Sequence, residues 1–224
     1  MTIVQQLMRL VPRRGTLPEP LALEGHDRAV VFLHGSFGSS GNFEAAARAV
    51  QAAGIPAVGV DYARRGLADL GHGEQQLAEV VRDVLRHVPV VDLVGHSLGG
   101  YMAFRLAARP EFAGRIRSIV GLGAAFKGMP VTGTRLQRRV IRWLVGPSFD
   151  QLIFEVPPSP DKHMHPDLMV VSVVSDADTV VPRSSSNVED IGRVVHVDGV
   201  EHGKMTDLVA HILEALDIPS AHTA

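Results

Sequence analysis

Short apolar runs alternate along this chain with longer stretches in which apolar residues recur at helical spacing. The apolar runs are rich in β-branched residues and cover residues 29–33, 55–60, 90–94, 116–122, 168–174 and 194–197. The stretches of helical periodicity include residues 42–53, 74–87, 98–108 and 204–216. Short, continuously apolar strands separated by helices are typical of a parallel sheet that is covered on both faces. We therefore predict an α/β fold with about six mostly parallel strands and helices on both faces.

The chain has 224 residues, a length that suits one domain. Two segments fall outside the alternation. Residues 1–27 predict a short helix followed by a proline-rich lead-in. Residues 127–167 hold six prolines and a helical stretch at 134–145, but no predicted strand. Such a long excursion is either a functional lid or pocket wall or a surface insertion, and the sequence leaves both interpretations open.

The helical stretch at 134–145 is amphipathic. Arginines at 135, 138, 139 and 142 form one stripe of it, beside the apolar residues Leu136, Val140, Ile141, Trp143, Leu144 and Val145. A basic amphipathic helix can lie on a membrane surface or cover an apolar pocket. More often such a helix packs against its own domain, and we favour this second interpretation from the sequence.

Composition narrows the range of functions. The formal net charge of −2 provides no basic field for nucleic acid, and no apolar run approaches the roughly 18 residues that span a bilayer. The absence of cysteine excludes disulfides, thiolate zinc sites and a cysteine nucleophile. No glycine-rich nucleotide-binding pattern follows a strand, so we expect no cofactor. His163 and His165 have no second pair of ligands nearby in the sequence, so we expect no metal. The N-terminus does not resemble a signal peptide, so we expect a cytoplasmic protein, whose oligomeric state the sequence leaves open.

The main chemical signal is the pattern Gly95-x-Ser97-x-Gly99. It follows an apolar strand and precedes a helix of small residues, as a nucleophile elbow does. Glycines are needed there because larger side chains would clash where the helix folds back against the strand. The N-terminal end of that helix would also favour a developing oxyanion. We therefore predict that Ser97 is a nucleophile rather than a helix cap in a glycine-rich turn.

The motif GHSLGG at residues 95–100 resembles the elbow of small bacterial lipases and related esterases of the α/β-hydrolase superfamily. FLHG at residues 32–35 is similar to their oxyanion loop, and VGLGA at residues 120–124 to the strand and loop that follow the elbow. The resemblance runs from about residue 28 to about residue 216. It implies the α/β-hydrolase fold and cofactor-independent hydrolysis of carboxylic esters.

In this fold the acid and then the histidine follow the serine along the chain. Asp178 lies just after the predicted strand 168–174, in the sequence DADTVVP, which is similar to the acid loop of the family lipases. Asp176 is the competing acid, and an Asx turn is the structural alternative for Asp178. His202 lies between the last strand and the last helix, where we expect the base, whereas His196 lies within a strand.

The oxyanion hole needs two hydrogen-bond donors. One is the backbone amide of Leu98, the residue after the nucleophile. The resemblance places the other on Ser36, after the His-Gly pair, with Phe37 as the alternative. Many lipases have an apolar residue at the position of Ser36, but only its backbone amide is required.

Ser97, Asp178 and His202 together predict a serine hydrolase that acts through an acyl-enzyme. His202 would take the proton of Ser97, and Asp178 would orient the imidazole ring. We expect a small-molecule acyl ester as the substrate and no nucleic acid or stable membrane insertion. A thioesterase or an acyltransferase would use the same three residues, and a binding protein that has kept the fold is the non-enzymatic alternative.

Overall fold

The computed structural model of the chain describes all residues except 1, 8–9, 12, 131–133, 155–166 and 220–224. Its centre is a six-stranded sheet in the order β2-β1-β3-β4-β5-β6. The strands are β1 (Arg28–Leu33), β2 (Ala57–Val60), β3 (Val90–His96), β4 (Ile116–Leu122), β5 (Met169–Ser175) and β6 (Arg193–Val197). Every neighbouring pair is parallel, which confirms the predicted fold class.

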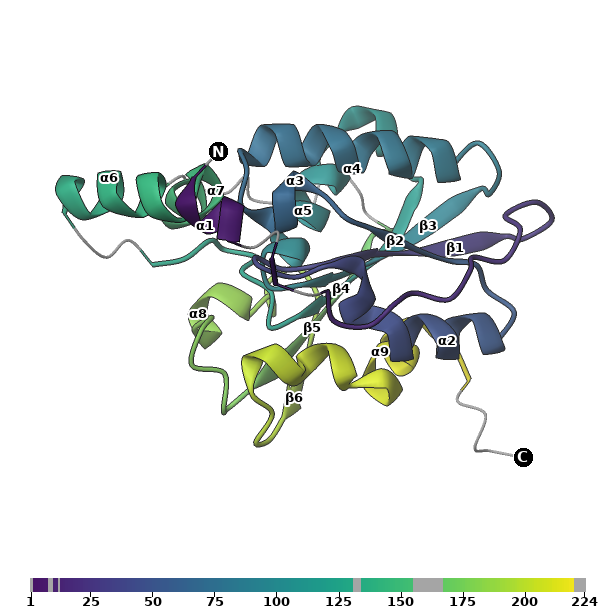
Figure 1. Cartoon of the computed structure of the whole chain (residues 1–224). Helices are drawn as coiled ribbons and strands as arrows, with labels where there is room; N and C mark the ends of the chain where they lie inside the picture. Colours follow the sequence, from purple (N-terminus) through teal and green to yellow (C-terminus); the bar gives the residue numbers. More distant parts are fainter. Residues whose placement is uncertain (1, 8–9, 12, 131–133, 155–166, 220–224) are drawn as a thin grey trace.

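Helices cover both faces of this sheet, as Figure 1 shows. One face packs against α4 (Leu70–Val84) and α5 (Leu98–Ala107), the other against α2 (Glu44–Ala52) and α9 (Val209–Ala215). The other helices are α1 (Ile3–Leu7), α3 (Ala63–Gly66), α6 (Arg135–Leu144), α7 (Pro147–Phe154) and α8 (Arg183–Ser186), with 3-10 turns η1 (Ser40–Phe43), η2 (Pro110–Phe112) and η3 (His202–Asp207). In the described part of the chain, no helix combines the length and apolarity that crossing a membrane requires.

Strand β1 shows why the apolar runs are continuous. Val31 and Leu33 belong to the core beneath α4 and α5, whereas Val30 and Phe32 belong to the core beneath α2 and α9. All four side chains are fully buried. Successive side chains of a strand point to opposite faces, so a strand covered on both sides needs apolar residues at every position.

The ends of the helices differ from the predicted bounds. The predicted helix 74–87 begins earlier, at Leu70, because the Asp69 side chain caps it by accepting a hydrogen bond of 3.0 Å from the His72 amide. The predicted helix 204–216 is divided into the 3-10 turn η3 and the helix α9. The division places His202 at the start of a separate tight turn, close to the end of β6.

Residues 127–167 form α6 and α7 in their described part and contain no strand there. α7 is anchored to the chain around α3 and α4. The Ser148 hydroxyl donates to the Gly66 carbonyl at 2.7 Å, and the Gln151 side chain accepts from the Leu70 amide at 2.8 Å. α7 therefore forms a wall of the domain. The two interpretations of the whole segment, as a lid or pocket wall and as a surface insertion, both stay predictions.

The C-terminal ends of parallel strands meet at one edge of the sheet, which is where open α/β sheets bind ligands. The strand order changes direction between β1 and β3, and a crevice opens at such a point. The residues singled out in the sequence all follow strands at this edge, with Ser36 after β1, Ser97 after β3, Asp178 after β5 and His202 after β6. The fold therefore gathers them into one region.

Candidate active site

Ser97 occupies a strained turn between β3 and α5. Its backbone has φ 53° and ψ −118°, in a region that residues with a side chain rarely adopt. Glycines make this close approach possible. A Cβ atom on Gly95 would overlap the backbone of Gly100, and one on Gly99 would overlap the carbonyl of Leu33. The sequence pattern is therefore explained by the sharp reversal from strand to helix.

Three backbone hydrogen bonds hold the turn at Ser97. The Ser97 amide donates to the Leu122 carbonyl of β4 at 3.1 Å. The Ser97 carbonyl accepts from the amides of Gly100 and Ala125 at 3.1 and 3.3 Å. Unusual backbone conformations persist where surrounding bonds determine them in this way, and such positions are often functional.

His202 and Asp178 form a hydrogen-bonded pair. His202 Nδ1 lies 2.8 Å from Asp178 Oδ2, and both side chains are largely buried. The other carboxylate oxygen, Oδ1, accepts from the amides of Val180 and Val181 at 2.8 and 2.9 Å. Burial by itself would raise the pKa of Asp178, but the hydrogen bonds from His202 and the two amides outweigh it and hold the pKa below its usual value. The carboxylate is thus a charged acceptor that fixes the ring.

Asp176, the competing acid, has a different partner. Its side chain is exposed, and Oδ1 accepts a hydrogen bond of 2.7 Å from the Gly199 amide, in the loop that follows β6. Asp176 thus connects the loop after β5 to the loop after β6. Of the two aspartates, the structure brings Asp178 to His202.

His96, the last residue of β3, also contacts His202. His96 Nε2 lies 2.9 Å from the His202 carbonyl oxygen, and the two ring centroids are 4.6 Å apart. A carbonyl oxygen can only accept, so we assign the proton to Nε2 of His96. Burial lowers the pKa of His96 to about 4, and the nearby His202 ring acts in the same direction. His96 is therefore a neutral donor at pH 7.

Gly123 makes room for the Asp178–His202 pair. Its backbone is left-handed, with φ 50°. A Cβ atom at this position would lie 2.7 Å from Asp178 Oδ2 and 3.2 Å from His202 Nδ1. Gly123 is therefore required both for the conformation of the chain and for the space that the pair occupies.

His96 connects Ser97 to His202. It precedes Ser97 in the chain, and its ring contacts the ring and the backbone carbonyl of His202. Among the described residues, no hydrogen bond joins the Ser97 hydroxyl to the His202 ring. Catalytic hydrogen bonds are often long without substrate and tighten when it binds. The structure thus brings the acid and the base together, and it places the serine at the same edge of the sheet, next in the chain to a residue that contacts His202.

The loop after β1 lies against the elbow. A Cβ atom on Gly35 would lie 3.0 Å from the Ser97 Cβ, closer than an ordinary van der Waals contact, so a glycine here permits the close approach of the loop to Ser97. The Phe37 amide already donates to the Arg65 carbonyl at 2.8 Å. Ser36, between them, is the remaining candidate in this loop for an oxyanion donor. The Leu98 amide is in the first turn of α5, where amides have no partner within the helix.

The buried side chain of His34 stabilises the loop after β1. It is 1% exposed, and burial lowers its pKa to about 4. Its Nδ1 donates to the Gly35 carbonyl at 2.8 Å, and its Nε2 accepts from the Tyr62 amide at 3.4 Å. The Tyr62 hydroxyl in turn donates to the His34 carbonyl at 2.8 Å, and the rings stack at 4.5 Å. A neutral histidine therefore ties the loop after β1 to the end of β2.

His34, His96 and Gly123 lie within the three motifs that carry the family resemblance, but the sequence analysis predicted no individual role for them. For the two histidines, the sequence contains a signal that could have indicated a place in the site. Each is a polar residue at the C-terminal end of an apolar strand, the edge where parallel sheets place their sites. Gly123 has the weaker signal of a glycine directly after a strand.

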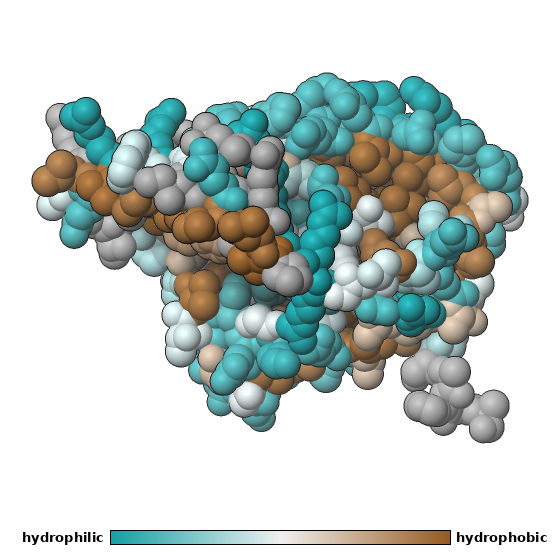
Figure 2. Space-filling model, in the orientation of Figure 1, coloured by the Kyte–Doolittle hydropathy of each residue, from teal (hydrophilic) through white to brown (hydrophobic). Residues whose placement is uncertain are grey.

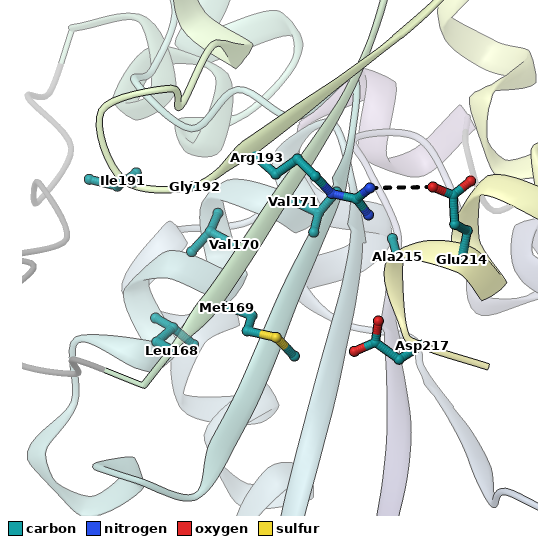
Figure 3. A pocket seen from close by; sticks show the side chains of 10 residues that line it. All are labelled: Leu168, Met169, Val170, Val171, Ile191, Gly192, Arg193, Glu214, Ala215 and Asp217. Atoms are coloured by element: carbon teal, nitrogen blue, oxygen red, sulfur yellow. Dashed lines mark hydrogen bonds and ion pairs between the residues drawn. The ribbon is translucent and has the colours of Figure 1, made fainter.

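One pocket of the described surface lies away from this region. A pocket of about 530 Å³ lies where β5 and β6 begin, beside the end of α9 (Figure 3). The ion pair between Arg193 and Glu214, with 3.3 Å between Nη1 and Oε1, crosses it. Because the strands are parallel, this pocket is at the edge of the sheet opposite Ser97. It contributes nothing to the site.

The sequence model of the α/β hydrolase fold family matches residues 28–188, well over half of the chain. The chain belongs to this family. The match begins at the first residue of β1 and includes the elbow at Ser97 and the loop that carries Asp178. The expected membership in the α/β-hydrolase superfamily is therefore confirmed.

Solved structures of α/β hydrolases resemble this one. A structure reported for the metagenome-derived lipolytic enzymes LipS and LipT has a TM-score of 0.65 at 14% identity and covers 90% of this chain and 98% of its own. The monoacylglycerol lipase of Paleococcus ferrophilus has a TM-score of 0.58 at 16% identity, covering 84% and 93%. RedJ, a thioesterase of Streptomyces coelicolor, has a TM-score of 0.60 at 16% identity, covering 96% of both chains. At these identities the likeness shows the fold alone.

Proposed function

We propose that this α/β hydrolase is a serine hydrolase that cleaves carboxylic esters of small molecules through an acyl-enzyme. The observation that carries the proposal is the Asp178–His202 hydrogen bond of 2.8 Å at the sheet edge where Ser97 stands in its strained turn. A nucleophile, an acid and a base, which follow one another in this order along the chain, are the set that such chemistry uses in this fold.

In the proposed mechanism, the Ser97 oxygen attacks the ester carbonyl while His202 Nε2 accepts the hydroxyl proton. The carbonyl oxygen, now negative, receives hydrogen bonds from the backbone amides of Leu98 and Ser36. His202 then donates its proton to the departing alcohol, which leaves an acyl group on Ser97. A water molecule, deprotonated by His202, releases the acid and restores the serine. Asp178 holds the ring orientation and stabilises the imidazolium throughout.

The acyl group has apolar surroundings beside this site. Phe37, in the loop after β1, is 40% exposed, and its ring lies 6.2 Å from the ring of Phe149 in α7. α7 belongs to the segment that interrupts the alternation of strands and helices. We infer that Phe37 and Phe149 line the acyl side of the site, because aromatic rings pair well with apolar chains.

The experiment that tests this function combines labelling and turnover. A fluorophosphonate probe should modify the wild-type chain on the peptide that contains Ser97, and Ser97→Ala should lose both labelling and hydrolysis of p-nitrophenyl acetate. Ser184→Ala, on the exposed part of α8, is the matched control and should keep both. Full activity of Ser97→Ala would overturn the assignment. A lack of labelling in the wild type would instead favour a binding protein.

A thioesterase is the second candidate. It is supported by the thioesterase RedJ, whose structure covers 96% of this chain, more of it than the other two structures described above. An ester and a thioester with the same acyl group separate the two functions. Faster turnover of the ester supports the first proposal, and faster turnover of the thioester supports the second.

A further inference from the structure

Four apolar side chains of helix α6 are exposed. Leu136, Val140, Trp143 and Leu144 lie at the spacing of one helical face and are all exposed, with Leu136 at 71% and Trp143 at 65%. Figure 2 shows this face as a hydrophobic band that runs along α6. Packing of the helix against its own domain, favoured from the sequence, is therefore wrong for these residues. An apolar helix face in water indicates an interaction surface.

The apolar surface extends onto the N-terminal segment. α1 lies beside α6 and α7 in Figure 1, and the Thr2 hydroxyl donates to the Val145 carbonyl at 3.2 Å. The residues that follow, Leu10 and Val11, are exposed, Leu10 at 81%. Seven of the eleven exposed large apolar residues of the described chain belong to these two segments: Leu7, Leu10, Val11, Leu136, Val140, Trp143 and Leu144. This concentration distinguishes the surface from isolated exposed side chains. We call these seven residues the docking face.

Positive charge accompanies the docking face. The sequence from 127 to 149 contains five lysines and arginines and no aspartate or glutamate, although the whole chain has a net charge of −2. Arg139 and Arg142 are exposed on α6. Arg142 lies 3.6 Å from the Asp150 carboxylate but keeps 63% of its side chain exposed. The helix therefore has an apolar face with cations beside it.

We propose that the docking face binds an anionic lipid surface. Leucine and tryptophan side chains would enter the boundary between headgroups and acyl chains, while Arg139 and Arg142 contact lipid phosphates. A second copy of this chain fits less well, because pairing through the same face would bring two sets of arginines together. An anionic surface neutralises them.

The docking face is continuous with the rim of the candidate active site. α7 follows α6 directly, and Phe149 of α7 contacts Phe37 in the loop after β1. Docking would therefore place the edge of the sheet that carries Ser97 near the lipid. Binding to lipid does not depend on the proposed hydrolysis, so each can be tested without the other.

Trp143 is the only tryptophan of the chain, which makes it a probe of docking. Its fluorescence should shift to shorter wavelength when the full chain is mixed with phosphatidylglycerol vesicles, and brominated acyl chains should quench it. Phosphatidylcholine vesicles should give little change, and salt should weaken the effect. Absence of a shift with phosphatidylglycerol overturns the proposal. A shift that follows protein concentration without lipid also overturns it, in favour of self-association.

Charge reversal on α6 gives a second test that leaves the probe in place. The double variant Arg139→Glu/Arg142→Glu should bind phosphatidylglycerol vesicles at least ~25-fold more weakly, because each basic residue near an anionic surface contributes about fivefold. The double variant Arg48→Glu/Arg86→Glu, at two exposed positions outside the docking face, is the matched charge control and should bind almost as well as the wild type. Circular dichroism should show that both variants are folded. An equal loss in the Arg48→Glu/Arg86→Glu variant would mean that net charge, not the docking face, controls binding.

Leu136→Ser tests the apolar contribution in the same way. It should reduce both vesicle binding and the quenching of Trp143, because it removes an exposed apolar side chain from the same helix face. Leu21→Ser, an exposed leucine outside the docking face, is its control. Equal binding of the two leucine variants would contradict insertion of the face.

Discussion

His96 Nε2 donates a hydrogen bond of 2.9 Å to the backbone carbonyl of His202. The residue next to the predicted nucleophile thereby holds the chain that carries the predicted base. The bond joins the end of β3 to the start of η3, two elements 106 positions apart in sequence. It fixes the backbone of His202, whereas Asp178 fixes its ring.

From this relationship we predict that His96 is a positioning residue. His96→Ala should lower kcat about 10–100-fold and leave KM within about threefold, because a displacement of about 1 Å of a catalytic group can cost that much. His96→Gln can still donate to the carbonyl and should recover part of kcat. Steady-state kinetics with p-nitrophenyl acetate measure both effects. An unchanged kcat in His96→Ala, or a loss that follows its melting temperature alone, would contradict the role.

Substitution of the two aspartates after β5 should have very different effects on kcat. Asp178→Asn should reduce kcat by about 10⁴-fold, because an amide in place of the carboxylate no longer selects the His202 tautomer. Asp176→Asn changes an exposed side chain that binds the Gly199 amide and should lower kcat only slightly. Turnover of both variants under saturating substrate checks this. Equal losses would show that the loop connection, not the pairing with His202, matters.

Gly123→Ala should displace the Asp178–His202 pair. The added Cβ would come within 2.7 Å of Asp178 Oδ2, in addition to the strain of φ 50°. We expect a loss of about 1–3 kcal/mol in the free energy of unfolding, together with a loss of at least tenfold in kcat.

Gly114→Ala is the matched control for that variant. Gly114 also has a left-handed backbone, with φ 68°, but no atom lies within 4 Å of a Cβ built there. It should lose about 1 kcal/mol of stability and keep its turnover. Urea denaturation and ester turnover measure the two quantities. If both glycine variants lose turnover equally, the effect of Gly123 is strain alone.

Stability should fall as the pH is lowered from 6.5 towards 4. Burial lowers the pKa of His34 to about 4 in the folded chain, while the unfolded imidazole titrates near 6.5. Between these values the unfolded state binds a proton that the folded state does not, so unfolding becomes easier as pH falls. His34 is 1% exposed, and its protonation should lower the free energy of unfolding by about 3 kcal/mol between pH 6.5 and pH 4. The buried His96 should lower the free energy of unfolding over the same range.

Urea denaturation at pH 7, 6 and 5 tests the titration. The slope of stability against pH should decrease by about 1.4 kcal/mol per pH unit in His34→Gln, because that side chain does not titrate. An equal slope in wild type and His34→Gln would contradict a neutral buried His34.

Much of the fold could be predicted from local pattern. The six apolar runs correspond to the six strands, since a strand covered on both faces needs apolar residues throughout. The ends of helices were less predictable. Asp69 caps α4 and adds a turn to it, and η3 separates His202 from α9, details that depend on individual hydrogen bonds rather than on periodicity.

The sequence by itself determined the sheet and the turn at Ser97, because both follow from local properties: continuous apolar runs, and glycines beside a serine at the end of one of them. Only the tertiary structure decided that His202 contacts Asp178 rather than Asp176, and that His96 and Gly123 support that pair. It also decided that the apolar face of α6 points to solvent. These are contacts between segments far apart in the chain, or choices between two sides of one helix, and periodicity is the same whichever side faces the core.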